Sequence, residues 1–150
     1  MSDMETMVRR GQIEDIERLL TFLKEARVGT EGIESAINYF LIMEDLEGNI
    51  KATLGIEPLN EYGLLRSLVM APRMKEKDLL VMFQQIFRLA RERNLSTLYL
   101  ATNKIGSLDF FQLLGFKKEE IEDLPEEMIQ SKHVQHILSV DNSVFMKLPL

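Results

Sequence analysis

Residues 64–116 decide the fold, and they read LLRSLVMAPRMKEKDLLVMFQQIFRLARERNLSTLYLATNKIGSLDFFQLLGF. The stretch Leu64–Met70 is almost continuously apolar and rich in leucine, which is typical of a strand buried on both faces. Apolar side chains then recur at helical spacing over Asp78–Arg93, so a long amphipathic helix is predicted there. A second short apolar strand is predicted at Leu98–Ala101. The stretch therefore indicates a strand–helix–strand unit.

Further elements are predicted on both sides of this unit. A short helix follows over Leu108–Leu114, and Gly115 ends it because glycine readily adopts the left-handed conformation that helix C-termini favour. Upstream, the apolar run Tyr39–Glu44 and the alternating run Ile50–Ile56 are joined by Glu47-Gly48-Asn49, which is a turn sequence. These two runs predict a β-hairpin.

The two ends of the chain complete the pattern. We expect a short strand at Thr6–Arg9, an amphipathic helix over Gln12–Ala26 with acidic residues in its first turn, and a short helix within Val28–Ile37. Near the other end, Pro125 is typical of the first turn of a helix, and Ser143–Leu148 alternates as a final strand does. The order of elements predicts one mixed α/β domain over residues 1–150, with helices packed on a sheet.

Composition excludes several classes of protein. The chain has 150 residues, which suits one domain, and 45% of them are apolar and 28% charged, as in ordinary globular proteins. The net charge is −6 and no basic cluster offsets it, so we expect neither nucleic acid nor a membrane as a partner. There are no cysteines, which excludes disulfides and thiolate metal sites.

Two further expectations concern location and metal. The polar N-terminus is unlike a secretory signal peptide and no run of ~18 apolar residues occurs, so we expect a cytoplasmic protein. His133 and His136 are three residues apart on a predicted helix, but no acidic or cysteine ligand set accompanies them. We therefore expect surface histidines and no metal site.

The order strand, basic loop, helix, strand and a helix ending in Gly115-Phe116 resembles the acyl-CoA-binding half of the GNAT N-acetyltransferase superfamily. Four shorter fragments resemble one subfamily: Gly55-Ile56-Glu57, Leu64-Leu65-Arg66-Ser67-Leu68, Phe110-Phe111 and Leu124-Pro125. Its members are short amino-acid N-acetyltransferases, similar to the catalytic domain of N-acetylglutamate synthase and to acetyltransferases encoded beside arsenic-resistance genes.

This resemblance implies a GNAT-like acyl-CoA N-acyltransferase fold, with a mixed, mostly antiparallel sheet and flanking helices. Two parallel central strands, Leu64–Met70 and Leu98–Ala101, are expected to splay apart and hold acetyl-CoA, the acyl donor, in a cleft. A small-molecule amine is the expected acceptor, and a homodimer is an open alternative to a monomer. The pyrophosphate is expected on backbone N–H groups at the N-terminus of the following helix.

The resemblance also implies a set of cofactor-binding residues on the first strand, on the loop and helix that follow, and near the second strand: Leu68, Val69, Met70, Lys75, Glu76, Lys77, Asp78, Leu79, Leu80, Asn103 and Phe111. The family usually has glycines where this chain has Glu76, Asp78 and Leu80. A carboxylate ~4 Å from a phosphate costs on the order of 4 kcal/mol at an effective dielectric constant of ~20. Alternatively, Asp78 as N-cap and Glu76 stabilise the helix without a ligand, in the phosphate's place.

The residues for proton transfer also depart from the family pattern. Phe111 stands where many family members have a tyrosine that protonates the leaving thiolate, and Leu64 stands where some have a glutamate base. Glu57, at the end of the preceding strand, is then the nearest carboxylate that could act as the base, directly or through water. The alternative is that Glu57 is an ordinary solvated acid at a hairpin end.

Two residues are candidates for binding the substrate. Arg66 lies between apolar neighbours, and a buried cation needs a partner. It either pairs with an internal carboxylate such as Glu57 or meets the carboxylate of a substrate. Tyr62 either supplies a hydroxyl near the mouth of the cleft or is an ordinary loop tyrosine.

Two functions follow from these observations. The first is an acetyl-CoA-dependent N-acetyltransferase with a degenerate pyrophosphate loop. The second is a non-catalytic GNAT-like module that binds or senses a metabolite or a protein, and it is suggested by the simultaneous loss of the glycines, the usual acid and the usual base.

Overall fold

The computed structural model describes residues 5–140 and 142–150. Over these residues, seven strands form one mixed sheet in the order β1-β2-β3-β4-β5-β7-β6. Their bounds are β1 Thr6–Arg10, β2 Phe40–Asp45, β3 Ile50–Leu59, β4 Tyr62–Met70, β5 Thr97–Thr102, β6 Lys117–Glu119 and β7 Val144–Pro149. The α-helices are α1 Ile16–Glu25, α2 Glu76–Glu92, α3 Leu108–Leu113, α4 Glu126–Gln130 and α5 Lys132–Val140. Short 3-10 helices lie at Ile13–Asp15, Glu34–Tyr39, Ile105–Ser107 and Ile121–Asp123.

The pairing of the strands confirms the predicted mixed α/β class. β1–β2, β2–β3, β5–β7 and β6–β7 are antiparallel. β4 and β5 are parallel, with Tyr62 opposite Thr97 and Leu64 opposite Tyr99. These two strands are the pair that the strand–helix–strand unit predicts, because a helix that returns the chain to the same end of the sheet makes its two strands parallel.

The contacts divide the described residues into two compact units. The first unit contains the residues up to Glu57 together with Arg66–Ala90. The second contains Pro58–Leu65 and Arg91–Leu150. Each unit has an apolar cluster of its own. The single domain expected over residues 1–150 stays a prediction.

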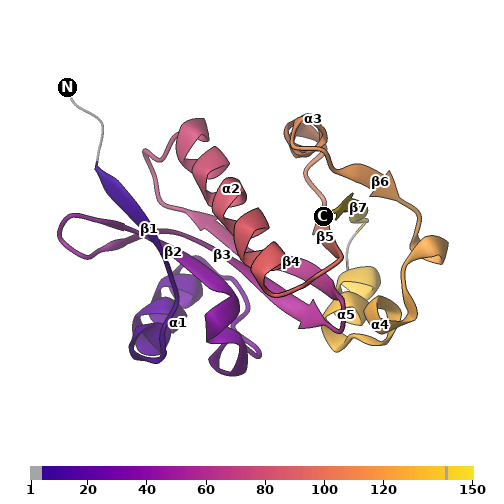
Figure 1. Ribbon diagram of the computed structural model, residues 1–150, viewed down its shortest axis with the longest axis horizontal. Helices are drawn as coiled ribbons and strands as arrows, with labels where there is room; N and C mark the ends of the chain where they lie inside the picture. The colour runs from indigo at the N-terminus through magenta and orange to yellow at the C-terminus, as the bar shows by residue number, and fades with distance from the viewer. Residues whose placement is uncertain (1–4, 141) are drawn as a thin grey trace. The chain divides into compact units, whose positions relative to one another are not determined.

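The first unit has a helix on each side of its strands. In Figure 1, α1 and α2 lie on opposite sides of β1, β2 and β3. Leu19 and Leu23 of α1 are fully buried in a cluster with Phe40 of β2. Met82 and Phe83 of α2 are buried as well. Burial of these apolar faces accounts for the helical periodicity in the sequence.

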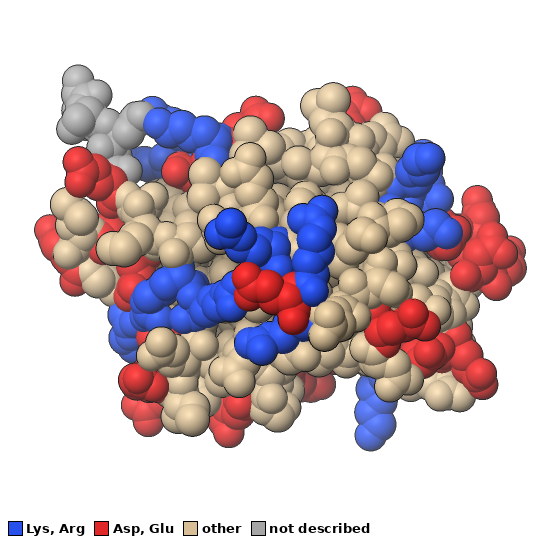
Figure 2. All heavy atoms as spheres, in the orientation of Figure 1, with Lys and Arg blue, Asp and Glu red and all other residues tan. Residues whose placement is uncertain are grey.

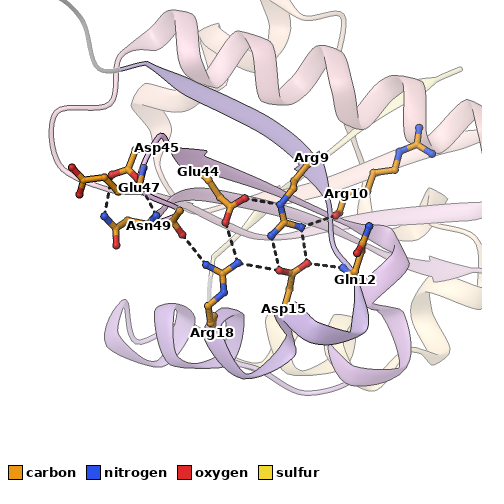
Figure 3. Close-up of polar contacts among 10 residues, drawn as sticks. Arg9, Arg10, Gln12, Asp15, Arg18, Glu44, Asp45, Glu47 and Asn49 are labelled. Carbon is orange, nitrogen blue, oxygen red and sulfur yellow. Dashed lines mark hydrogen bonds and ion pairs between the residues drawn. The ribbon is translucent and has the colours of Figure 1, made fainter.

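An ion network also holds α1 against the strands (Figure 3). The buried carboxylate of Asp15 accepts hydrogen bonds from the guanidinium groups of Arg9, at 2.7 Å, and Arg18, at 3.0 Å. The same two arginines donate to Glu44 on β2, at 2.6 and 3.0 Å. Arg18 also donates to the backbone carbonyl of Gly48 in the β2–β3 turn. The network therefore connects β1, α1 and the hairpin.

The apolar cluster of the second unit lies around its parallel strands. Leu64 and Tyr99, from that pair of strands, pack with Phe145 of β7. Helices α4 and α5 contribute Met128 and Val134 to the same cluster. A helix after Pro125 and a final strand were both predicted, and α4 and β7 confirm them.

Three boundaries differ from the predictions. Strand β3 continues to Leu59, beyond the predicted end at Ile56, and β4 begins at Tyr62, before the predicted start at Leu64, so that only a turn separates them. The short helix expected within Val28–Ile37 is the 3-10 helix Glu34–Tyr39. Helix α2 begins at Glu76, two residues earlier than predicted. Asp78 is therefore not the N-cap that the sequence suggested but the third residue of the helix.

Within the described ranges, none of the helices has the length and apolar character needed to cross a membrane.

Candidate functional site

Strand β4 contains a left-handed residue in its middle. Ser67 has a φ of 58°, although it is not glycine, and it is 9% exposed. Its backbone carbonyl accepts a 2.8 Å hydrogen bond from the hydroxyl of Thr53 on β3, which is fully buried. A left-handed non-glycine residue is strained and persists only where its surroundings hold it, which is common at functional sites. Sequence reasoning missed both residues; the only indication was a serine inside an apolar run.

Arg66, next to Ser67, is held by backbone carbonyls. Its Nη1 donates to the carbonyl oxygen of Glu31 at 2.6 Å, and its Nη2 lies 3.5 Å from that of Gly29. Its Nε donates to the hydroxyl of Ser67 at 3.2 Å. Burial lowers the pKa of Arg66, while the carboxylates of Glu57 and Glu31 act in the opposite direction. The hydrogen bonds of Arg66 thus go to two backbone carbonyls and a hydroxyl, and its pairing with an internal carboxylate or with a substrate carboxylate stays a prediction.

The guanidinium group of Arg66 also lies over an aromatic ring. The guanidinium carbon lies 5.9 Å from the centre of the Phe40 ring, which is within the range of a cation–π contact. Phe40 is opposite Gly55 in the β2–β3 ladder. A Cβ atom at Gly55 would lie 2.5 Å from Cζ of Phe40, so only glycine leaves room for this ring. Gly55, Phe40 and Arg66 thus form a stack across three strands.

Glu57, the predicted base, lies near the end of β3 and is partly buried. It is two residues after Gly55 and so on the same face of β3, where the Phe40 ring packs on Gly55 and the Arg66 guanidinium lies over that ring. The structure thus brings together two residues predicted from the sequence, Glu57 and Arg66. A carboxylate in this position has the chemistry that a general base needs.

The three predicted cofactor-binding residues at the end of β4 differ in their surroundings. Leu68 is 38% exposed. Val69 packs against the cluster under α1, and Met70 is partly buried. After the strand, the backbone N–H of Ala71 donates to the carbonyl oxygen of Lys51 at 2.8 Å. That bond places the end of β4 beside β3.

The N-terminus of α2 carries both charges. Lys75, Glu76 and Lys77 are partly or fully exposed. The carboxylate of Asp78 accepts a 2.9 Å hydrogen bond from the backbone N–H of Lys75. Leu79 is partly buried, and Leu80 is 38% exposed. Mixed charge is also a feature of the surface that Figure 2 displays, where Asp and Glu side chains lie among Lys and Arg side chains.

The first turn of α2 carries groups that attract an anion and carboxylates that repel it. The N–H groups that begin an α-helix have no partner within the helix, and the helix dipole attracts negative charge there. Lys75 and Lys77 add positive charge. Asp78, however, already supplies a negative oxygen to one N–H group in this turn.

The second unit holds the remaining predicted residues. Tyr62 packs edge to face with Tyr99, with ring centres 6.0 Å apart. Burial raises the pKa of both phenols, and Glu61 for Tyr62 and Glu119 for Tyr99 act in the same direction. Both hydroxyls therefore remain protonated at neutral pH. Tyr99, which sequence reasoning did not select, is 4% exposed.

Asn103 and Phe111 lie elsewhere in the second unit. Asn103 is exposed in the loop after β5. Phe111 of α3 is 8% exposed and packs edge to face against Phe110 and Phe116. Its ring therefore contributes to the packing around the Gly115 turn.

Over residues 5–140 and 142–150, His, Asp and Glu side chains form no group of three or more that could hold a metal ion.

Solved structures that resemble this fold include acetyltransferases. The chain matches N-acetylglutamate synthase from Neisseria gonorrhoeae, complexed with coenzyme A and N-acetyl-glutamate, with a TM-score of 0.74 and 20% identity over 99% of this chain and 36% of that one. It matches a Mycobacterium tuberculosis protein in complex with CoA with a TM-score of 0.75 and 18% identity, covering 96% of this chain and 99% of that one. A GNAT-family acetyltransferase from Staphylococcus aureus gives 0.74 and 18%, covering 97% and 99%.

The fold is therefore that of the GNAT acetyltransferases, as the sequence resemblance predicted. The chain spans about a third of the length of the gonococcal synthase and nearly all of the other two proteins. No family model matches the sequence.

A curated relative places the chain more narrowly. It is 35% identical over 141 residues to the uncharacterized protein YwlB of Bacillus subtilis (strain 168), covering 93% of this chain and 95% of that protein. The chain belongs to the family of YwlB.

Proposed function

We propose that this protein is an acetyl-CoA-dependent N-acetyltransferase that acts on a small amine by direct transfer. The observation that carries the proposal is the GNAT fold, which extends over nearly the whole chain and is shared with proteins crystallised with coenzyme A. The left-handed conformation of Ser67 in β4 supports it, because backbone strain of this kind is common at functional sites.

The donor would be held by β4 and the start of α2. Leu68, Val69 and Met70 follow the left-handed residue, and their backbone can meet the thioester end of the donor. The N–H groups of the first turn of α2, with the charges of Lys75 and Lys77, would take the pyrophosphate. Asn103 and Phe111 stay predicted donor-binding residues on the second unit.

Glu57 would act as the general base. Acetyl-CoA supplies the acetyl group as a thioester. The carboxylate of Glu57, directly or through one water, takes a proton from the acceptor amine, whose nitrogen then forms the new C–N bond as the C–S bond breaks. A backbone N–H of β4 would stabilise the negative charge on the carbonyl oxygen. The thiolate leaves with the electron pair of the broken bond and takes a proton from solvent.

The acceptor class is a small amine or an amino-acid-like molecule. The gonococcal synthase was crystallised with N-acetyl-glutamate, an acetylated amino acid, which supports an acceptor of that size. Tyr62 stays a predicted substrate-binding residue, with a phenol whose pKa is raised by burial and by Glu61.

A second function is favoured by the contact between Asp78 and the Lys75 N–H. With its own carboxylate at the start of α2, the protein would bind CoA poorly and act as a non-catalytic module that binds another metabolite. The two functions differ in their response to acetyl-CoA.

The test is a calorimetric titration with acetyl-CoA, followed by an assay of free thiol release with a panel of amino acids and amines. The enzyme should bind acetyl-CoA with micromolar to submillimolar affinity and release CoA only when an acceptor is present. No heat and no thermal shift at millimolar acetyl-CoA would exclude the transferase and leave the binding module.

A further inference from the structure

Arg66 joins two segments that are far apart in the sequence. Its guanidinium donates to Glu31, which is 35 residues away, and reaches the carbonyl of Gly29, while its Nε holds the hydroxyl of Ser67. We propose that Arg66 is a positioning residue that anchors the turn Gly29–Gly32 to the strained part of β4, beside Glu57.

The geometry suits a guanidinium and not an ammonium group. Arginine presents five N–H donors in a flat, rigid fork, so one side chain can serve two carbonyls and a hydroxyl at once. The flat group also lies over the Phe40 ring. A lysine at this position would carry the charge but could not span the same acceptors.

The turn itself is shaped to meet Arg66. Gly32 has a φ of 75°, in the left-handed region that favours glycine, and a Cβ atom there would lie 3.8 Å from Nη1 of Arg66. The hydroxyl of Ser35 donates to the carbonyl of Gly32 at 3.1 Å, which fixes the end of the turn. Because the guanidinium takes carbonyls of this turn as partners, its removal leaves the turn without this anchor on β4.

The position beside Glu57 gives the anchor a consequence for function. Glu57 is two residues after Gly55 on β3 and therefore on the same face of the strand, where the Phe40 ring packs on Gly55 and the Arg66 guanidinium lies over that ring. Because the same guanidinium donates to the carbonyl of Glu31, the turn lies near the proposed base. If Glu57 is the base, as the proposed function has it, the turn forms one wall of the acceptor site. This part of the inference rests on the proposed function. Arg66 would then set acceptor affinity through the turn, without touching the acceptor's carboxylate.

The first test needs no substrate. Hydrogen–deuterium exchange of peptides covering residues 28–36 is compared in wild type, Arg66→Met and Arg66→Lys. Methionine keeps the apolar stem over Phe40 and removes the donors. We expect exchange about tenfold faster in both variants, since a tenfold change corresponds to the loss of one hydrogen bond. Arg88→Met, at an exposed position of α2, is the matched control and should leave this peptide unchanged.

Peptides from α1 serve as an internal reference. If they speed up as much as residues 28–36, Arg66 stabilises the whole unit and the proposal is wrong. It is also wrong if residues 28–36 exchange at the wild-type rate in both variants.

The second test separates positioning from substrate binding. An amino acid that the wild type acetylates is compared with the amine that has the same side chain and no carboxylate. We expect Arg66→Lys to raise KM for both acceptors by the same factor and to leave KM for acetyl-CoA unchanged. A rise confined to the amino acid would mean that Arg66 binds its carboxylate, which overturns the proposal. Absence of acetylation by the wild type would count against the proposed function alone, because the exchange test still decides the role of Arg66.

Discussion

The carboxylate of Asp78 accepts a hydrogen bond from the backbone N–H of Lys75 at 2.9 Å, so a negative charge from α2 itself lies at the start of this helix. A glycine at this position would place no carboxylate in the way of a phosphate. The contact explains why α2 starts at Glu76, and it gives the first prediction.

Asp78→Asn should raise the affinity for acetyl-CoA. The amide oxygen can still accept from the Lys75 N–H, but the charge is gone. If solvent reduces the repulsion to about a quarter of the ~4 kcal/mol Coulomb energy, the gain is roughly fivefold in Kd. Calorimetry at low salt measures it, and the gain should shrink at high salt. Glu14→Gln removes an exposed carboxylate far along the chain and should change nothing. Equal affinities for Asp78→Asn and wild type would show that Asp78 does not oppose the donor.

Glu57→Gln should lower kcat and leave donor binding intact. The glutamine is of similar size but cannot accept the amine's proton, so a fall of about 10²–10⁴-fold is expected for a general base. Acetyl-CoA titration of the same variant should give the wild-type Kd. Glu47→Gln, in the exposed β2–β3 turn, is the matched control. Full activity of Glu57→Gln would leave Glu57 as an ordinary acid at the end of a hairpin.

Thr53→Val should destabilise the protein through Ser67. Valine has nearly the shape of threonine, but it leaves the carbonyl of the strained Ser67 without its hydroxyl donor in a buried place. The expected loss is about 1–3 kcal/mol in the free energy of unfolding, measured by urea denaturation. Thr21→Val removes an exposed hydroxyl that bonds within α1 and should stay within about 0.5 kcal/mol of wild type. A neutral Thr53→Val would mean that Ser67 is held by other groups.

Gly55→Ala should displace the ring of Phe40. The new methyl group would lie 2.5 Å from Cζ of a fully buried ring, so either the ring or the strand must move. Overpacking of this kind costs about 1–3 kcal/mol, which thermal denaturation can detect. Gly106→Ala is the control, since nothing lies within 4 Å of the place that its methyl group would occupy. If the two alanine variants have the same melting temperature, the stack of Gly55, Phe40 and Arg66 is not tightly packed.

Stability should fall in acid because of Asp15. The hydrogen bond from Arg9 holds the pKa of Asp15 well below its usual value. A carboxylate with a lowered folded-state pKa stabilises the protein fully above its unfolded pKa of about 3.9, and this stabilisation is lost as the pH falls further. Asp15→Asn should therefore cost about 2 kcal/mol at pH 7, because it leaves two partly exposed arginines with one fewer acceptor.

Urea denaturation at pH 7 and at pH 3 checks this prediction. The difference between wild type and Asp15→Asn should narrow at pH 3, whereas Asp123→Asn, at an exposed position, should match wild type at both. If the difference in the free energy of unfolding is the same at both pH values, the charge of Asp15 does not account for its effect on stability.

Much of the fold could be predicted from local patterns. The apolar run at Leu64–Met70 and the helical spacing after it became β4 and α2, because the side-chain period of an element decides which face it can bury. The turn after β3 could not be placed, since cross-strand pairing extends β3 and β4 beyond the residues with a clear pattern. The start of α2 was misplaced because a single carboxylate contact decides it.

The candidate site could be predicted only in part. Glu57 and Arg66 were selected as chemical groups, and the structure brings them to the same side of the Phe40–Gly55 contact. Thr53 and Ser67 were not selected, because a buried hydroxyl in a strand has the same local pattern whether or not it supports a strained neighbour.

The order and periodicity of the elements, which the sequence alone determined, were enough for the class of fold, since each element depends mainly on neighbours within a few residues. The partners of Arg66 and the left-handed conformation of Ser67 were decided by the tertiary structure alone. Those features depend on contacts between segments up to 37 residues apart. Such contacts exist only when the strands and the turn that supply them have come together.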